Sequence, residues 1–579
     1  MAGDMTRRTF VASSAGAAAA VYLGGCGGTR APGARTVRLA GNGFGFPSPF
    51  AYIAGPGYVQ MSYLYDTLVW KDASGRIIPW LATRFERSRD GLTYTFELRR
   101  GVAWHDGRPV TAADVAFTFS YFARQSLGPL LVAQAFGVKG ARATGSHTVE
   151  VVLEIPAVTF LESVAGALPI IPKHVWSTIR DAPRAQDPRV LVGSGPYRLA
   201  SFSPGEGASL YLANRRYFLG PPFIRRIELR PVDDELSALR AGEIDVADTP
   251  AEGVARDALA TFASDPAFGM VQAAGSFTFP LIWNIGRGGA LADVRFRRAC
   301  ALAIDRQAMV DRVLGGNGQP GNPGFLPPGN PFHVPVEQYG FDRRTAERLL
   351  DQAGYRRSST DGPRHGPDGR PLRFRIVTGN APVPPVLDLL VGGLKAVGVQ
   401  LSPQAVDLPT LFGLTRQGSD DIALTLYPGP GGTAPDGDPD TLRTFYSSQI
   451  KERLQGAQGY RNPEFDRLAG EQLVAHGEGE RRRIIARMQH LVARDLPALP
   501  LYYPNLYNVF RKRAFDRWYY TPGGVASGVP TVFNKQVLVT GNRTGLRIRG
   551  QPPTRGALIP AVTELAWPAR PGSPGRRRA

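Results

Sequence analysis

Residues 90–115 read DGLTYTFELRRGVAWHDGRPVTAADV, and this stretch contains the clearest local signals in the chain. Apolar and polar side chains alternate over 92–98, which predicts a half-buried strand because successive strand residues point to opposite faces. An Asp-Gly pair marks a turn after this strand. Thr111 then stands three residues before Asp114, a spacing typical of the capped first turn of a helix. The stretch therefore predicts a strand, a turn region and a helix in direct succession.

Strand and helix patterns alternate on both sides of this stretch. Strand patterns occur at 148–153, 197–203, 227–229, 244–247 and 374–378, and helix patterns at 234–241, 296–314, 343–353, 386–397 and 480–494. Such alternation predicts an α/β protein. A length of 579 residues allows about three domains. We find no repeat of about 20–50 residues, which argues against solenoids and propellers.

The composition excludes several classes of protein. Hydrophobic residues make up 43% and charged residues 20%, as in ordinary globular chains, which excludes wholesale disorder. The two cysteines, Cys26 and Cys300, are too few for a disulfide scaffold or a cysteine-based zinc finger. The net charge is +19, but the arginines are scattered along the chain, so we predict no nucleic-acid partner. Cys300 lies within a helix pattern and is predicted to be a buried small hydrophobe.

The first 26 residues have the features of an export signal. Residues 11–23 are Ala-rich and weakly apolar, and a stretch of 13 residues is too short to cross a membrane as a helix. Residues 6–10, TRRTF, resemble a twin-arginine (Tat) export motif, and residues 23–26, LGGC, resemble a lipobox. We therefore expect a Tat-type lipoprotein signal over 1–26, a lipid on Cys26, and an extracytoplasmic protein anchored to the cell membrane. The alternatives are an ordinary positively charged signal region and a plain thiol.

Several further motifs occur in one consistent order along the chain. They are Asp90-Gly91-Leu92-Thr93-Tyr94-Thr95-Phe96, Trp104-His105-Asp106-Gly107, Thr111-Ala112-Ala113-Asp114-Val115, Ile171-Pro172-Lys173-His174, Gly193-Ser194-Gly195-Pro196-Tyr197, Gly242-Glu243-Ile244-Asp245 and Arg461-Asn462-Pro463. In number, order and spacing they resemble the family 5 extracellular solute-binding proteins, the peptide- and nickel-type receptors of ABC importers, over about residues 36–520. The resemblance implies a two-lobe periplasmic-binding-protein-like fold of the large cluster C type, with a hinge, an extra N-terminal subdomain and a ligand held between the lobes.

The resemblance also implies a domain organisation. Lobe I would comprise 27–57, 190–284 and 499–545, and residues 58–189 would form its additional subdomain. Lobe II would be 285–498, with the chain crossings near 279–284 and 500–505. Residues 546–579 are rich in Pro, Gly and Arg and are predicted to be a disordered tail.

In peptide-binding members, an acidic residue just before an Asp-Pro pair holds the ammonium group of the ligand. The matching segment here is 426–440, where Pro435 takes the matching position and Asp436 follows it, so Asp436 is our candidate. A solvated or turn-capping Asp is the alternative. Further ligand candidates are Tyr427, Trp283, Asn284, Tyr58 and Tyr503. For each aromatic side chain taken singly, packing in the core is the alternative and the more common outcome.

Dipeptide-binding members also use an arginine that holds the carboxylate of the ligand. The matching loop contains no arginine. Arg375 lies before it, within a predicted strand, and the next arginine in the chain is Arg416. This departure from the family pattern favours longer or blocked peptides, or another solute, over free dipeptides.

The resulting prediction is a monomeric substrate-binding lipoprotein that captures peptides and delivers them to the permease of an ABC importer, with no cofactor, no metal and no enzymatic activity. One alternative is a non-peptide solute, such as a sugar or a metal chelate. Another is an extracytoplasmic sensor or interaction protein without a transport role. A periplasmic hydrolase has no support, because the sequence contains no Gly-x-Ser-x-Gly, P-loop or His-x-x-x-His motif.

Overall fold

The computed structural model describes residues 35–41, 43–52, 54–73, 75–124, 137–203, 206–250, 253–274, 277–357, 359, 362–379, 384–427, 438–450, 456–521, 524–525 and 531–542. Several predictions fall outside these residues: the export signal over 1–26 with Cys26, the ligand candidate Asp436 and the tail over 546–579.

An eight-stranded mixed sheet is built from segments that are far apart in the chain. Its strands, in pairing order, are β12 (Phe268–Ala274), β21 (Tyr502–Arg511), β11 (Val246–Asp248), β1 (Thr36–Gly41), β10 (Arg226–Pro231), β9 (Ala208–Ala213) and β8 (Tyr197–Ser203), and β14 (Gly318–Pro320) pairs with the first residues of β21. Strand β1 is parallel to β10 and β11, and the other pairs are antiparallel. Helices α4 (Glu235–Ala241) and α5 (Arg256–Ala263) share a hydrophobic cluster with β11, β12 and β21.

A four-stranded antiparallel sheet lies within the predicted additional subdomain. It pairs in the order β4 (Ala82–Arg87), β5 (Thr93–Leu98), β7 (Thr148–Leu153) and β6 (Val138–Ala143). Around it are α1 (Ala54–Ser62), the β2–β3 hairpin (Val69–Lys71 and Ile77–Pro79), α2 (Ala112–Phe122), the π-helix η1 (Leu161–Ala165), α3 (Lys173–Trp176) and the 3₁₀-helix η2 (Pro188–Leu191). The predicted helix start is confirmed, since the Asp114 carboxylate accepts hydrogen bonds from the Thr111 backbone N–H at 2.9 Å and its hydroxyl at 2.8 Å.

A five-stranded sheet, in the order β18 (Gln400–Ala405), β17 (Arg373–Thr378), β19 (Ile422–Leu424), β13 (Pro280–Trp283) and β20 (Ala498–Pro500), is covered on both faces. Leu281 and Trp283 belong to one hydrophobic cluster and Ile282 to another, because neighbouring strand residues face opposite sides. The first cluster includes residues of α7 (Val294–Ala303), α8 (Arg306–Val313), α9 (Arg343–Gln352) and α10 (Pro384–Ala396). The second includes residues of α11 (Leu408–Gln417), α12 (Asp440–Tyr446), α13 (Pro463–Val474) and α14 (Glu478–Asp495).

Three short elements complete this part: the 3₁₀-helix η3 (Ile285–Arg287), helix α6 (Gly289–Ala292) and the β15–β16 pair (Arg356–Arg357 and Arg364–His365). The single helix predicted over 296–314 is wrong. The structure has two helices, α7 and α8, because Ile304 leaves the helical conformation and the Asp305 carboxylate accepts a hydrogen bond from the Ala308 N–H at 2.8 Å, which starts a new helix.

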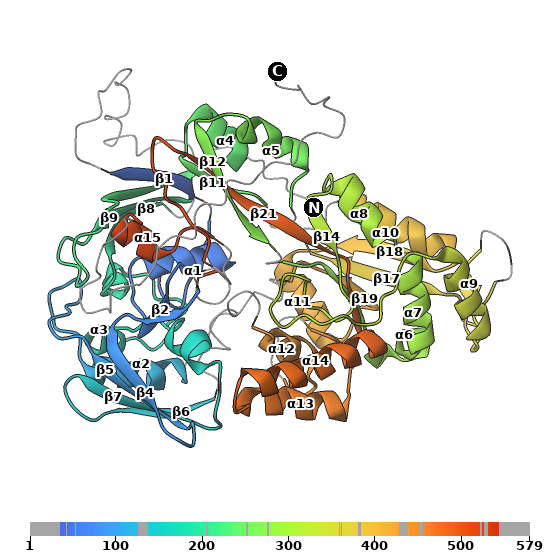
Figure 1. Ribbon diagram of the computed structural model, residues 1–579, viewed down its shortest axis with the longest axis horizontal. Coiled ribbons are helices and arrows are strands. Elements are labelled where there is room, and N and C mark those ends of the chain that lie inside the picture. The colour runs from blue at the N-terminus through green and yellow to red at the C-terminus, as the bar shows by residue number, and fades with distance from the viewer. Residues whose placement is uncertain are drawn as a thin grey trace, which may run out of the picture. The chain divides into compact units, whose positions relative to one another are not determined.

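The chain passes between the eight-stranded and five-stranded sheets at two short crossings, besides the longer segments on either side of β14. The first runs from β12 to β13, and the second is Leu501 alone, between β20 and β21. Figure 1 shows β21 leading from the strands β11 and β12 to β14. The α/β class is therefore confirmed, while the predicted domain boundaries stay a prediction.

The C-terminal segment 531–542, which contains α15 (Lys535–Thr540), returns to the N-terminal part of the chain. The Lys535 Nζ donates a hydrogen bond to Asp66 Oδ1 at 3.0 Å, and both side chains are 0% exposed. The Asn534 side chain accepts a hydrogen bond from the Trp70 indole N–H at 2.7 Å. This segment is thus part of the core beside the four-stranded sheet.

Candidate functional site

Tyr427 lies beside the first chain crossing. Its backbone exchanges two hydrogen bonds with Thr278, at 2.8 and 3.1 Å, and the Thr278 hydroxyl donates to the Tyr502 carbonyl oxygen at 3.0 Å. The half-buried Tyr427 ring makes edge contacts with Phe325 and Phe445, with ring centroids 5.7 and 4.8 Å apart. One of the predicted ligand residues is therefore next to both short crossings between the sheets.

Tyr503 reaches the same place from β21. Its hydroxyl donates to the Phe325 carbonyl oxygen at 2.8 Å and accepts from the Asn322 backbone N–H at 3.2 Å. Phe325 is buried and has φ of 74°, a left-handed conformation that is uncommon for a bulky residue. Such backbone strain is common at ligand sites, so Phe325 is a site candidate that its sequence alone did not suggest.

The other three described candidates lie elsewhere and are almost fully buried. Tyr58 is 1% exposed, and its hydroxyl donates to the Ala167 carbonyl oxygen at 2.8 Å. Trp283 is 0% exposed and packs against Phe296. The Asn284 amide donates to the Asp420 carbonyl oxygen at 2.7 Å. The structure thus brings Tyr427 and Tyr503 together around Phe325, and gives the other three packing or hydrogen-bonding roles; ligand contact by any of the five stays a prediction.

Buried ion pairs surround the point where the chain enters α12. Arg481 donates two hydrogen bonds to the Asp438 carboxylate, one of them at 2.8 Å, and Arg443 donates two to Asp440, at 2.6 and 2.7 Å. Burial raises the pKa of Asp440, but the charge and hydrogen bonds of Arg443, the Arg481 charge and the Gln472 hydrogen bond together hold this pKa below its ordinary value. Both carboxylates are therefore already bound by arginines.

A second ion pair, from the N-terminal half of the chain, lies close to the first group. Lys71 Nζ is 2.9 Å from the Glu162 carboxylate. Burial raises the pKa of Glu162, and the Lys71 charge opposes this effect. The Asp438 charge also raises this pKa, and the Arg481 charge lowers it. These buried charges were missed by sequence reasoning, and only the Asp438-Pro439 pair marked their position.

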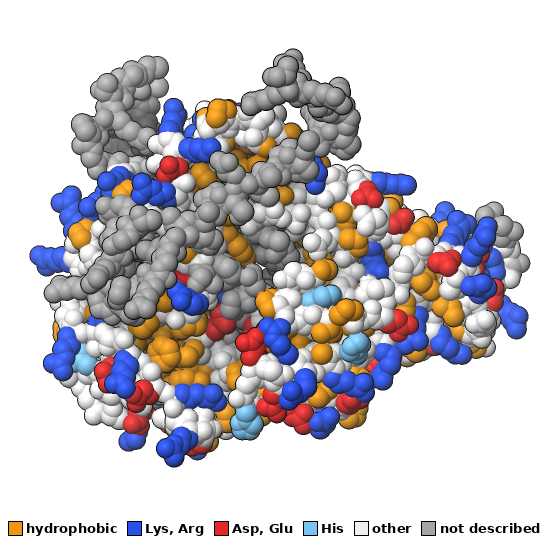
Figure 2. Space-filling model, in the orientation of Figure 1, with side chains coloured by type: hydrophobic (Ala, Val, Ile, Leu, Met, Phe, Trp, Pro, Cys, Tyr) orange, Lys and Arg blue, Asp and Glu red, His pale blue; other side chains and the backbone are white. Residues whose placement is uncertain are grey.

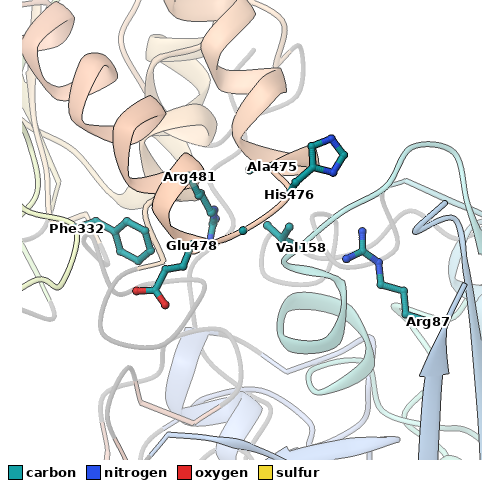
Figure 3. A pocket seen from close by; sticks show the side chains of 8 residues that line it. Arg87, Val158, Phe332, Ala475, His476, Glu478 and Arg481 are labelled. Carbon is teal, nitrogen blue, oxygen red and sulfur yellow. The ribbon is translucent and has the colours of Figure 1, made fainter. Parts of the chain in front are cut away.

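A cavity of about 270 Å³ lies next to Arg481. Arg87 at the end of β4 and Val158 line one side, and Phe332, His476, Glu478 and Arg481 line the other. The Val158 N–H donates to the Leu473 carbonyl oxygen at 3.0 Å and so ties the two sides together. Figure 3 shows the Arg87 side chain extending toward Val158 and the loop that carries His476.

Other sequence predictions concern charge, metals and thiols. Arg375 donates to the Ser419 carbonyl oxygen through its guanidinium group and to Asp421 through its backbone N–H. Burial raises the pKa of the Cys300 thiol, which is 0% exposed.

In the part of the chain that the structure describes, no three His, Cys, Asp or Glu side chains are grouped as a metal site, and no helix is both long and apolar enough to cross a membrane.

The basic charge is spread over the surface. In the view of Figure 2, Lys and Arg side chains are scattered among acidic, apolar and uncharged ones over the described residues. This pattern matches the scattered arginines of the sequence.

Comparison with known proteins places this chain in a family. The model named "Bacterial extracellular solute-binding proteins, family 5 Middle" matches residues 76–452. Proteins of this family are solute-binding components of ABC importers rather than enzymes, and they act outside the cytoplasm.

Individual relatives agree with this match. The oligopeptide-binding protein AppA of Bacillus subtilis is 24% identical over 514 residues, which are 84% of this chain and 91% of that protein. Protein XP55 of Streptomyces lividans is 31% identical over 360 residues, which are 60% of this chain and 62% of that protein.

Solved structures share the two-lobe fold. The AppA structure from Bacillus subtilis with a nonapeptide has a TM-score of 0.71 at 21% identity, covering 87% of this chain and 98% of that one. The NikA structure from Brucella suis with Fe(III)-EDTA has a TM-score of 0.72 at 23% identity, covering 86% and 99%. The expected two-lobe fold is confirmed. The chain belongs to the family 5 bacterial extracellular solute-binding proteins.

Proposed function

We propose that this protein binds peptides between its lobes and delivers them to the permease of an ABC importer. The observation that carries the proposal is the match to AppA over 84% of the chain, because AppA is an oligopeptide-binding protein whose solved structure holds a nonapeptide. The competing solute is a metal chelate, since NikA, which holds Fe(III)-EDTA, is as similar in fold.

Asp436 is our candidate for the residue that holds the ligand ammonium group. Among the acidic residues of segment 426–440 that the structure describes, Asp438 is bound by Arg481 and Asp440 by Arg443. Removing either carboxylate from its arginine would leave a buried charge without a partner, which costs several kcal/mol. Neither is therefore suited to receive an ammonium group, and Asp436 is the acid of this segment that we assign to it.

Native mass spectrometry of the purified protein tests the peptide assignment. We expect a series of co-purified peptides, released on denaturation, and we expect Asp436→Ala to bind the recovered peptides at least about 10-fold more weakly in calorimetry, equal to about 1.4 kcal/mol. Asp388→Ala, which removes an exposed acid on α10, serves as the control. A single non-peptide or metal-containing mass would overturn the peptide assignment, and unchanged affinity would remove Asp436 from the site.

We further propose that the protein is a Tat-exported monomer held at the membrane through a lipid on Cys26. The lipobox-like residues 23–26 and the twin-arginine-like residues 6–10 support this anchor. Cells that express the chain in labelled palmitate are expected to incorporate the label, and Cys26→Ser to abolish it and release the protein from the membrane fraction. Equal labelling of the Cys26→Ser variant would disprove the anchor.

A further inference from the structure

The cavity beside Arg481 has a cationic group, the exposed Arg87 guanidinium, on its wall. The Arg87 side chain makes no ion pair and no hydrogen bond with any residue that the structure describes, although it lines the cavity from the end of β4. The nearby Asp90 carboxylate interacts with the Arg87 charge electrostatically, but its hydrogen bonds come from the Ser88 hydroxyl at 2.5 Å and the Leu92 N–H at 3.0 Å.

The Arg87 guanidinium lies beside the turn at Gly91. It lies over Gly91, where a Cβ atom would come within 2.2 Å of its terminal nitrogen and 2.9 Å of Cζ. Gly91 has φ of 73°, a conformation that favours glycine, so this turn both requires glycine and leaves room for the arginine.

The other charged groups at the cavity already have partners. Arg481 is bound to Asp438, and the Glu478 carboxylate accepts hydrogen bonds from Arg482, one at 3.0 Å. The His476 imidazole also lines the cavity, and its N–H can donate a hydrogen bond to a ligand beside the Arg87 guanidinium. Since no acid among the lining residues remains for Arg87, the cavity favours a ligand group that carries negative charge.

The remaining surface of the cavity is apolar. Val158, Ala475 and the ring of Phe332 contribute to the lining, and Phe332 also lies 4.8 Å from the Arg482 guanidinium carbon. A volume of about 270 Å³ has room for one amino-acid residue rather than a whole peptide. An anion attached to an apolar group is the chemistry that this lining fits.

We infer that the cavity binds the last residue of a peptide, with Arg87 holding its C-terminal carboxylate and Val158, Ala475 and Phe332 packing on its side chain. The inference rests on the proposed peptide ligand and deepens it. It does not require Arg375, whose guanidinium group donates to the Ser419 carbonyl oxygen. Arginine suits this role because its planar donor pair matches a carboxylate.

Two synthetic peptide mixtures test the inference. Both contain peptides of about four to nine residues with apolar last residues; one mixture has free C-terminal carboxylates and the other has C-terminal amides. The full chain is expected to bind the free acids at least about 5-fold more tightly than the amides, and Arg87→Gln to reduce this ratio to below about 2-fold. Arg89→Gln, on the same exposed turn, is the matched control and keeps the ratio.

Each other outcome overturns a stated part of the argument. Equal binding of acids and amides by the unchanged protein, or an unchanged ratio in Arg87→Gln, removes the carboxylate site but keeps the peptide ligand. If neither mixture binds, the proposed function fails and this inference fails with it. Binding of N-acetyl-leucine alone, as tight as that of the peptides and lost in Arg87→Gln, would show a separate site for free carboxylates instead. Thermal melting of each variant shows whether it is folded.

Discussion

Asp66→Asn lowers the free energy of unfolding by about 3–5 kcal/mol, because it leaves the Lys535 ammonium group buried without a counter-charge. Both side chains are 0% exposed, and their N···O distance is 3.0 Å. Burial lowers the pKa of Lys535, and Asp66 opposes this effect. The Asp66 carboxylate also accepts hydrogen bonds from the Trp80 indole at 2.8 Å and from the Tyr217 and Ser194 hydroxyls, both at 2.9 Å.

Urea unfolding monitored by tryptophan fluorescence measures this change. Arg84→Gln is the matched control, because it also removes one partner of an ion pair, with Glu86, but the two side chains are 63% and 62% exposed, so it costs less than about 1 kcal/mol. The double variant Asp66→Asn/Lys535→Met is expected to recover part of the loss, since it removes both charges. A cost for Asp66→Asn no larger than that of the control would contradict the importance of the buried pair.

Gly193→Ala is expected to lower the free energy of unfolding by about 3 kcal/mol through a backbone clash. A Cβ atom on Gly193 would lie 1.8 Å from the Leu64 carbonyl oxygen. Neither backbone can easily retreat, because the same carbonyl oxygen accepts from the Gly195 N–H at 2.8 Å and the Gly193 carbonyl oxygen accepts from the His105 N–H at 2.8 Å.

The same substitution at an open helical glycine is the control. Gly470 lies in α13 with no heavy atom within 4 Å of a Cβ position, so Gly470→Ala is expected to raise stability by about 0.5–1 kcal/mol. Urea midpoints at an unchanged m-value give both differences. Similar midpoints for the two variants would show that the chain around Leu64 adjusts to the added methyl group.

Local structure was predictable wherever neighbouring residues decide it. The strands at 148–153 and 197–203 match β7 and β8, and Thr111 marks the start of α2 as its spacing to Asp114 predicts. The break between α7 and α8 was missed because the apolar pattern continues through Asp305. The Asp305 carboxylate starts the second helix by accepting a hydrogen bond from the Ala308 backbone N–H, and the apolar pattern does not record this contact. Periodicity alone does not separate one bent helix from two.

The site was predictable only in part, because its charges meet through the tertiary fold. Tyr427 was found from its place before the Asp-Pro pair, and it lies at the chain crossing. Tyr58 and Trp283 carry no local sign that would distinguish a ligand contact from the buried packing that the structure gives them. Lys71, Glu162 and Arg481 come from distant segments, so no spacing could have grouped them.

The ion pair between Asp66 and Lys535 also has a consequence for the order of events during synthesis. The two residues are 469 positions apart, so Asp66 leaves the ribosome long before its partner is translated. Until Lys535 is translated, the Asp66 carboxylate lacks its counter-charge and must stay hydrated, so the N-terminal region cannot pack around it as in the folded protein. Premature termination anywhere before Lys535 would release a chain that can never complete this core, which makes such products ready targets for quality-control proteases.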